Sequence, residues 1–296
     1  MEIVSNIPFE PYLRKIIEVA KCNPMEINYQ LEIIKLLLEV ILSEYQIPDT
    51  SNNSEPKDRG GESKHNRYYY TLKNGTAPDL LIAKNYKYDN RNDKPDIFAV
   101  VEVKHQSSAE MFNREFDGYS IHLVNELATY MCVNNKAIAT NCRRWQFFDR
   151  TKSEKFDEEF LKAYLSIVDL LWPIDSKRFK DNTDYFILEL QKKIEGYNQL
   201  AEKCNRIRVV KKDEQWYAAC VDLLKKHTRE IVKSCLCKTI DVLPNSRIVT
   251  EEQYTESIEL DDYVKDLIGL NTQTVIKTPK EWYELIEYIP QFVSNP

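Results

Sequence analysis

The feature that most constrains the fold is a helical segment that stands between two short apolar strands. Residues 96–105, DIFAVVEVKH, have the composition of a buried strand, and residues 137–140 have that of another. Between them, residues 111–131 carry apolar side chains near helical spacing. Strands of one sheet that are joined by a helical crossover run parallel, so this order predicts at least one parallel pair and an α/β fold.

Further strand segments surround this unit. They are residues 67–73, 77–83 and 145–148. A polar tip, NYKYDNRNDKP, joins residues 77–83 to residues 96–105, which makes these two segments natural antiparallel neighbours. The predicted sheet is therefore mixed.

Helices are predicted on either side of these strands. Asn23-Pro24 is typical of a helix start, because asparagine caps well and proline suits the first helical position. This helix should run to about Glu44, and its apolar residues on nearly every side indicate burial. Helical patterns, such as residues 156–171 and 185–204, dominate after Ser153.

These patterns divide the chain of 296 residues into two predicted units. Residues 1–150 form an α/β domain with a mixed sheet flanked by helices. Residues 151–296 form a mostly helical domain, and no motif in it indicates its role.

Composition indicates a globular protein without a membrane span. No apolar run reaches the roughly 18 to 20 residues that a span needs, and the first residues lack the pattern of a secretory signal. We therefore expect a cytoplasmic protein, and the seven irregularly spaced cysteines predict no disulfide framework. The net charge of −6 is only weak evidence against nucleic-acid binding, because affinity depends on local charge.

Three charged residues in the predicted sheet suggest chemistry. Glu102 and Lys104 lie two apart in one strand and therefore share a face, and Asp79 lies in the neighbouring strand. Mg²⁺ prefers oxygen ligands and usually takes one or two protein carboxylates. A nearby lysine can orient or deprotonate the attacking water. We predict a catalytic centre for phosphodiester hydrolysis, with Asp79 and Glu102 on Mg²⁺ (or Mn²⁺ as a substitute) and Lys104 at the water. The structural alternative is a turn residue beside a cross-strand salt bridge.

These residues also carry a family resemblance. Pro78-Asp79 followed by Glu102-Val103-Lys104 resembles the PD-(D/E)xK signature of restriction-endonuclease-like nucleases. Glu126-Leu-Ala-Thr-Tyr130 and the segments 137–141 and 145–148 resemble the nuclease domain of type I restriction motor subunits. The resemblance covers about residues 23–150. It implies a restriction-endonuclease-like core and a Mg²⁺-dependent endonuclease that cleaves DNA in restriction or phage defence.

The resemblance also implies further site residues. Glu26 would complete the metal shell, because Glu26-Ile-Asn-Tyr-Gln30 resembles the Glu-x-x-x-Arg opening of the type I module. Glu32 is the alternative ligand, and helix capping is the structural alternative for Glu26. Nucleic-acid contacts are expected from Glu126, Tyr130, Arg143 and Arg144. The alternatives are a core position or a contact to the metal-site lysine for Tyr130, and a solvated turn for the two arginines.

Two residues depart from the type I pattern. Glu126 stands where that family has glutamine, and Cys142 stands where it has glycine. No phosphate loop of the form G-x-x-x-x-G-K-[ST] occurs, so the chain resembles the nuclease module without its ATP-driven motor.

Other functions stay open at this point. A catalytically silent module of the same fold would bind nucleic acid, and an interaction subunit would bind a protein partner through residues 151–296. Many nucleases of this fold act as dimers, so a homodimer is a further expectation. No membrane partner is expected.

Overall fold

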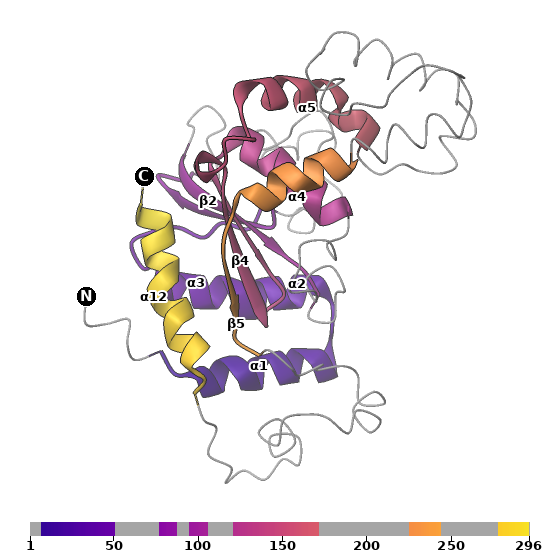
Figure 1. Ribbon diagram of the computed structural model, residues 1–296. Coiled ribbons are helices and arrows are strands. Elements are labelled where there is room, and N and C mark those ends of the chain that lie inside the picture. Colours follow the sequence, from indigo (N-terminus) through magenta and orange to yellow (C-terminus); the bar gives the residue numbers. More distant parts are fainter. Residues whose placement is uncertain are drawn as a thin grey trace.

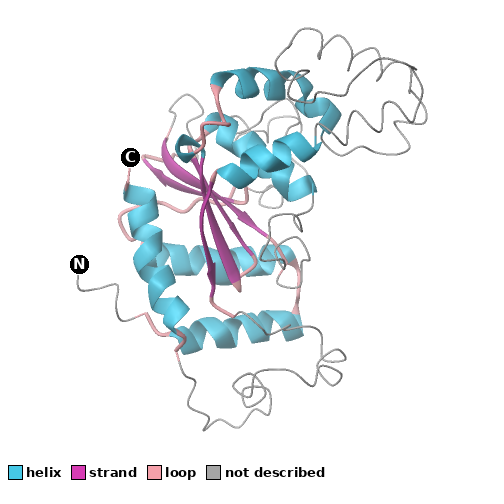
Figure 2. Cartoon of the chain, viewed as in Figure 1, coloured by secondary structure: helices cyan, strands magenta, loops and turns pink. Residues whose placement is uncertain are grey.

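The computed structural model describes residues 7–50, 77–87, 95–105, 121–171, 225–243 and 278–295. Within them, a five-stranded sheet lies between two groups of helices (Figures 1 and 2). The strands are β1 (Leu80–Lys84), β2 (Asp96–Val103), β3 (Lys136–Thr140), β4 (Arg144–Asp149) and β5 (Leu236–Asp241). The strand predicted at residues 67–73 and the helix predicted at 185–204 lie outside the described residues.

Two groups of helices cover the two faces of the sheet. On one face lie α1 (Phe9–Cys22), α2 (Glu26–Tyr29), the π-helix Gln30–Lys35 that continues into α3 (Leu36–Ile41), and α12 (Lys280–Ser294). Towards the other face lie α4 (Ile121–Val133), α5 (Glu158–Leu171) and the helical residues 225–234; a 3₁₀ turn, Arg150–Lys152, precedes α5. Among the described helices, none is long and apolar enough to cross a membrane.

The sheet has the order β1-β2-β3-β4-β5 and is mixed. β2 and β3 run parallel, with α4 in the connection between them, and every other neighbouring pair is antiparallel. The crossover predicted this parallel pair, and the hairpin tip predicted the antiparallel pairing of β1 with β2. The α/β class and the mixed sheet are confirmed.

Alternation along β2 directs Val101 and Val103 to one face of the sheet and Glu102 to the other. Val101 and Val103 are fully buried in one core with residues of α1, α3 and α12, as is Leu80 of β1. Because successive strand residues point to opposite faces, Glu102 points to the other side, towards α4.

Two segments of the second half of the chain complete this core. β5 adds to the edge of β4, and Ile240, Trp282 and Leu285 belong to the same apolar cluster as α1 and α3. The Lys136 Nζ of β3 donates a hydrogen bond of 2.7 Å to the carbonyl oxygen of Phe292 in α12. We predicted a separate, mostly helical unit after residue 150. β5 and α12 fall within that predicted unit and pack against the sheet, because β4 offers an edge and α12 an apolar face. The division at residue 150 stays a prediction.

The N-terminal helices also differ from prediction. The helix expected at Asn23 begins at Glu26 and has no side-chain cap, and α1 before it was not predicted. The helix was expected to be buried on all sides, which is wrong: Leu36 is 52% exposed and Val40 is 62% exposed. Only one face of this helix meets the sheet, and α1 covers the other incompletely.

Candidate active site

Asp79 and Glu102 face each other at one end of the sheet. The antiparallel register pairs Leu80 with Val101, so continuing it by one residue sets Asp79 opposite Glu102. Asp79 lies just before β1, and its Oδ2 accepts a hydrogen bond of 2.7 Å from the backbone N–H of Val103. Glu102 is 4% exposed. The strands therefore bring two carboxylates together, as the sequence predicted.

Lys104 joins this pair from the end of β2. Its Nζ lies 2.7 Å from Oε1 of Glu102 and 2.8 Å from Oε2 of Glu126 in α4. The side chains of Lys104, Glu102 and Glu126 are 12%, 5% and 16% exposed, so solvent screens these ion pairs little. Lys104 also continues the parallel ladder, because its backbone N–H donates to the Thr140 carbonyl at 2.8 Å. The ladder of β2 with β3 therefore fixes the backbone of Lys104, and the carboxylates of Glu102 and Glu126 fix its ammonium group.

Tyr130 completes the cluster from α4. Its hydroxyl donates to Oε2 of Glu102 at 2.9 Å and lies 3.1 Å from the carbonyl oxygen of Ala77. Tyr130 is 1% exposed. It therefore holds the Glu102 carboxylate, which is a role that differs from the nucleic-acid contact expected for it.

Burial and charge shift the pKa values of this cluster. Desolvation raises the pKa of Asp79 well above its usual value, and the charge of Glu102 raises it further, against the Val103 N–H and Lys104, which lower it. For Lys104, burial lowers the pKa, but the charges and hydrogen bonds of Glu102 and Glu126 outweigh burial and the pKa is raised. Lys104 is therefore a cation at neutral pH. Desolvation and the neighbouring carboxylates raise the pKa of Tyr130, so it stays a neutral donor.

Glu26 lies at the rim of this cluster. It is exposed at the first turn of α2, and its Oε2 accepts a hydrogen bond of 3.0 Å from the backbone N–H of His105. Its charge contributes to the raised pKa of Asp79. Glu32, the alternative, lies elsewhere: it pairs with Lys15 of α1 at 2.8 Å. Of the two glutamates, Glu26 is the one at the site.

The two arginines expected to contact phosphate are buried. Arg144 forms an ion pair with Asp241 of β5, with Nε 2.5 Å from Oδ1 and Nη2 3.0 Å from Oδ2. Arg143 is 5% exposed, and its Nη2 donates to the Leu243 carbonyl at 3.2 Å. Both guanidinium groups therefore bind residues in or just after β5. The sequence analysis did not predict that this segment lies beside them.

Residues that hold Asp79 from behind were missed by the sequence analysis. The backbone carbonyl of Asp79 accepts from Gln30 Nε2 at 3.1 Å and from the Thr50 N–H at 2.9 Å. A signal for Gln30 was present, because it lies one turn after Glu26 and ends the segment Glu26–Gln30 that carries part of the resemblance. No local signal pointed to Thr50.

The donor set fits a divalent metal of the Mg²⁺ type. Asp79 and Glu102 offer carboxylate oxygens, and burial and the charge of Glu102 raise the pKa of Asp79, which a bound cation would lower. Within the described residues, no three His, Cys, Asp or Glu side chains form a metal shell by themselves. Mg²⁺ requires only one or two, since water and substrate phosphate fill the rest.

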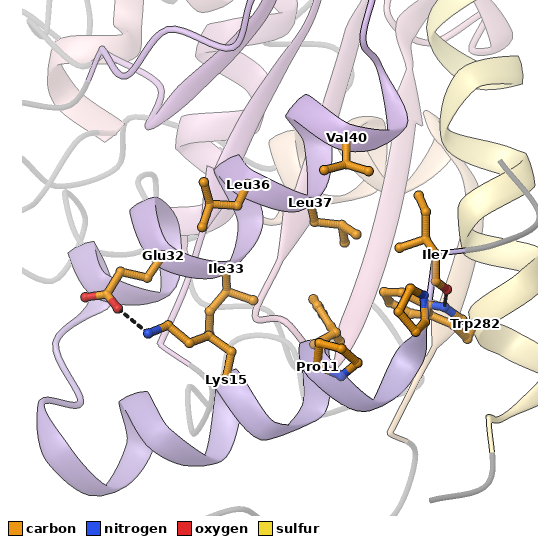
Figure 3. A pocket seen from close by; sticks show the side chains of 11 residues that line it. Ile7, Pro11, Lys15, Glu32, Ile33, Leu36, Leu37, Val40 and Trp282 are labelled. Atoms are coloured by element: carbon orange, nitrogen blue, oxygen red, sulfur yellow. Dashed lines mark hydrogen bonds and ion pairs between the residues drawn. The ribbon is translucent and has the colours of Figure 1, made fainter. Parts of the chain in front are cut away.

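An open groove lies apart from this cluster. It has a volume of about 610 Å³ and runs between α1 and the helix α2–α3, with Trp282 of α12 among its lining residues and the Lys15–Glu32 ion pair at its rim (Figure 3). Its other lining side chains are mainly apolar, including Ile33 and Leu36. It offers mainly apolar surface, and its charged residues, Lys15 and Glu32, are paired with each other.

Comparisons of the chain with family models, with curated proteins and with solved structures gave no match. Its function is therefore inferred from the chemistry of the site.

Proposed function

We propose that the chain is a Mg²⁺-dependent endodeoxyribonuclease with a restriction-endonuclease-like core. The observation that carries this proposal is the cluster of two facing carboxylates, Asp79 and Glu102, with the Lys104 ammonium bound to one of them. The parallel pair of β2 and β3, with a helix in its connection, agrees with the order of elements in the family that the sequence resembles. DNA as the substrate and a role in restriction or phage defence rest on that resemblance alone.

In this proposal, Asp79 and Glu102 would hold the metal, with water and substrate phosphate in the rest of its shell, and Glu26 at the rim is the further ligand that the resemblance implies. Bound there, Mg²⁺ would acidify a water and neutralise charge on the phosphate, and Mn²⁺ would substitute for it. Lys104 is held as a cation, so it orients the water and stabilises developing negative charge rather than taking the proton. Tyr130 keeps the second oxygen of Glu102 in place.

The backbone at Cys142 supports the resemblance to the type I module. Its φ is 68°, in the left-handed region that favours glycine. The resembled family has glycine at this position. The turn between β3 and β4 therefore has the conformation that such a glycine serves, although this chain has a cysteine.

Cleavage of supercoiled plasmid with Mg²⁺ or Mn²⁺ tests the proposal. We expect nicking or linearisation by the wild type and none by Lys104→Ala. Lys15→Ala is the matched control, because Lys15 also pairs with a glutamate but lies at the groove. Full activity of Lys104→Ala would refute the proposed centre.

One contact favours a second candidate, a catalytically silent module that binds nucleic acid. Lys104 is paired with two carboxylates, and the second, Glu126, stands where the resembled family has neutral glutamine. Two negative charges reduce the field that Lys104 exerts on a phosphate. Binding of DNA or RNA without Mg²⁺, measured by fluorescence anisotropy and with no cleavage of any substrate tried, would favour this module.

A further inference from the structure

Gln30 has an environment that packing alone does not explain. It is 1% exposed, and the other buried residues beside it in the helix, Tyr29, Ile33 and Ile34, are apolar or aromatic. Its Nε2 donates two hydrogen bonds, one of 2.9 Å to Oδ1 of Asp49 and one of 3.1 Å to the backbone carbonyl of Asp79. The buried amide is therefore bound to the main chain of a proposed metal ligand.

Asp79 lies just before β1, which begins at Leu80, and outside the residues that pair β1 with β2. Its main chain is bonded to other segments. Its carbonyl is held by Gln30 and by the Thr50 N–H, and the Thr50 hydroxyl donates to the carbonyl of Pro78. On the opposite side, the Val103 N–H holds the Asp79 carboxylate at 2.7 Å.

The helix is irregular at this residue. Gln30 is the first residue of the π-helix Gln30–Lys35, which separates α2 from α3. Such turns carry an extra residue, are rare, and occur frequently at functional sites. Glu26 and Gln30, one helical turn apart, both contact this end of the sheet, whereas Ile33 lines the groove.

We infer that Gln30 is a positioning residue, whose amide fixes the main chain of Asp79 so that its carboxylate meets a divalent cation beside Glu102. The inference rests on the proposed function, because it assigns Gln30 a role towards the metal of that site. The bonds of its amide nitrogen run to the Asp79 carbonyl and to Asp49, so the role assigned to Gln30 is to hold Asp79 and not to ligate the metal.

Binding of Mn²⁺ to the full chain, measured by electron paramagnetic resonance, tests this role without relying on cleavage. Gln30→Met keeps the volume but removes the donor, and Gln30→Asn is the milder variant, polar but too short to reach. We expect about tenfold weaker binding in both, the effect of one net hydrogen bond. The control is Gln46→Met, because the Gln46 amide also bonds to backbone, that of Tyr86, near the far end of β1.

Cleavage kinetics supply a second readout. The Mg²⁺ concentration for half-maximal rate should rise about tenfold in the Gln30 variants, while KM for DNA stays unchanged. A merely structural role would reduce the amount of active protein and leave the metal affinity of the folded fraction unchanged. If either Gln30 variant folds and binds Mn²⁺ like the wild type, this inference alone is overturned. If the folded wild type binds no Mn²⁺ and cuts nothing, the proposed function fails and the inference fails with it.

Discussion

The two sides of the helix α2–α3 differ in kind. On one side, Glu26 and Gln30 contact the end of the sheet where Asp79 and Glu102 meet. On the other side, apolar residues such as Leu36 line an open groove (Figure 3). The groove has a volume of about 610 Å³, yet few polar side chains line it. In this molecule, buried charge rather than concave shape marks the site.

Each side has a lysine–glutamate pair, and the two pairs differ in burial. Lys15 and Glu32 at the groove are 31% and 48% exposed, whereas Lys104 and Glu102 are 12% and 5% exposed. An exposed pair costs little to form, but a buried one must repay a large desolvation penalty and is weak evidence for stability. A function for the buried pair would account for its retention.

The largest effect is expected from removing a charge on the site side. Glu102→Gln should lower the cleavage rate about a thousandfold, because the carboxylate proposed to hold the metal and Lys104 loses its charge. Glu32→Gln, the same change on the groove side, should cleave like the wild type. Plasmid nicking rates measure both, and equal rates for the two variants would remove the distinction between the sides.

A matched pair of leucines tests the same comparison through stability. Leu38 is fully buried and Leu36 is 52% exposed, two residues apart in α3. Leu38→Ala should cost about 2–5 kcal/mol of unfolding free energy. Leu36→Ala should cost less than about 0.5 kcal/mol. Urea denaturation followed by circular dichroism measures both, and similar losses would mean that the groove face is covered in solution.

The elements that could be predicted from sequence are those defined by local pattern. β2 and β3 were recognisable as apolar runs, and the helix between them determined their parallel pairing. α1 was missed although its buried residues Phe9, Leu13 and Ile16 have helical spacing. β5 was missed because its side chains are mostly half-exposed, with Cys and Lys in place of a strong apolar alternation. Its pairing with β4 depends on residues about 90 positions away.

The site could be predicted to the same extent. Asp79, Glu102 and Lys104 lie on or directly beside two strands that are adjacent along the chain, so alternation and a hairpin suffice to bring them together. Arg144 was predicted to contact nucleic acid. Its ion-pair partner, Asp241, lies 97 residues later, so no local pattern indicated that the two would meet. Local pattern describes side-chain direction within one element, but it does not describe which distant element covers it.

Asp79 should make stability depend on pH. Its pKa is raised in the folded chain, so the stabilisation from holding its proton is present below the unfolded value of about 4 and is lost as pH rises through the folded value. Asp79→Asn removes this loss and should raise the unfolding free energy at pH 8 by more than about 0.5 kcal/mol, and by less at pH 4. Urea denaturation with a chelator at both values measures this, and equal differences would contradict it. Added Mg²⁺ should then stabilise the wild type alone.

The smallest effect is expected at Glu126. Substitution there changes the charge of the cluster but keeps a side chain that can accept a hydrogen bond from Lys104. Glu126→Gln keeps an oxygen for the Lys104 ammonium, 2.8 Å away, and removes one negative charge. We expect the cleavage rate to rise about fivefold, because Lys104 is then less neutralised and DNA phosphate is repelled less. Single-turnover cleavage measures this. A rate that falls instead would mean that the charge of Glu126 is needed to hold Lys104. Activity in the variant but not in the wild type would identify the natural chain as the silent module, with Glu126 as the residue that silences it.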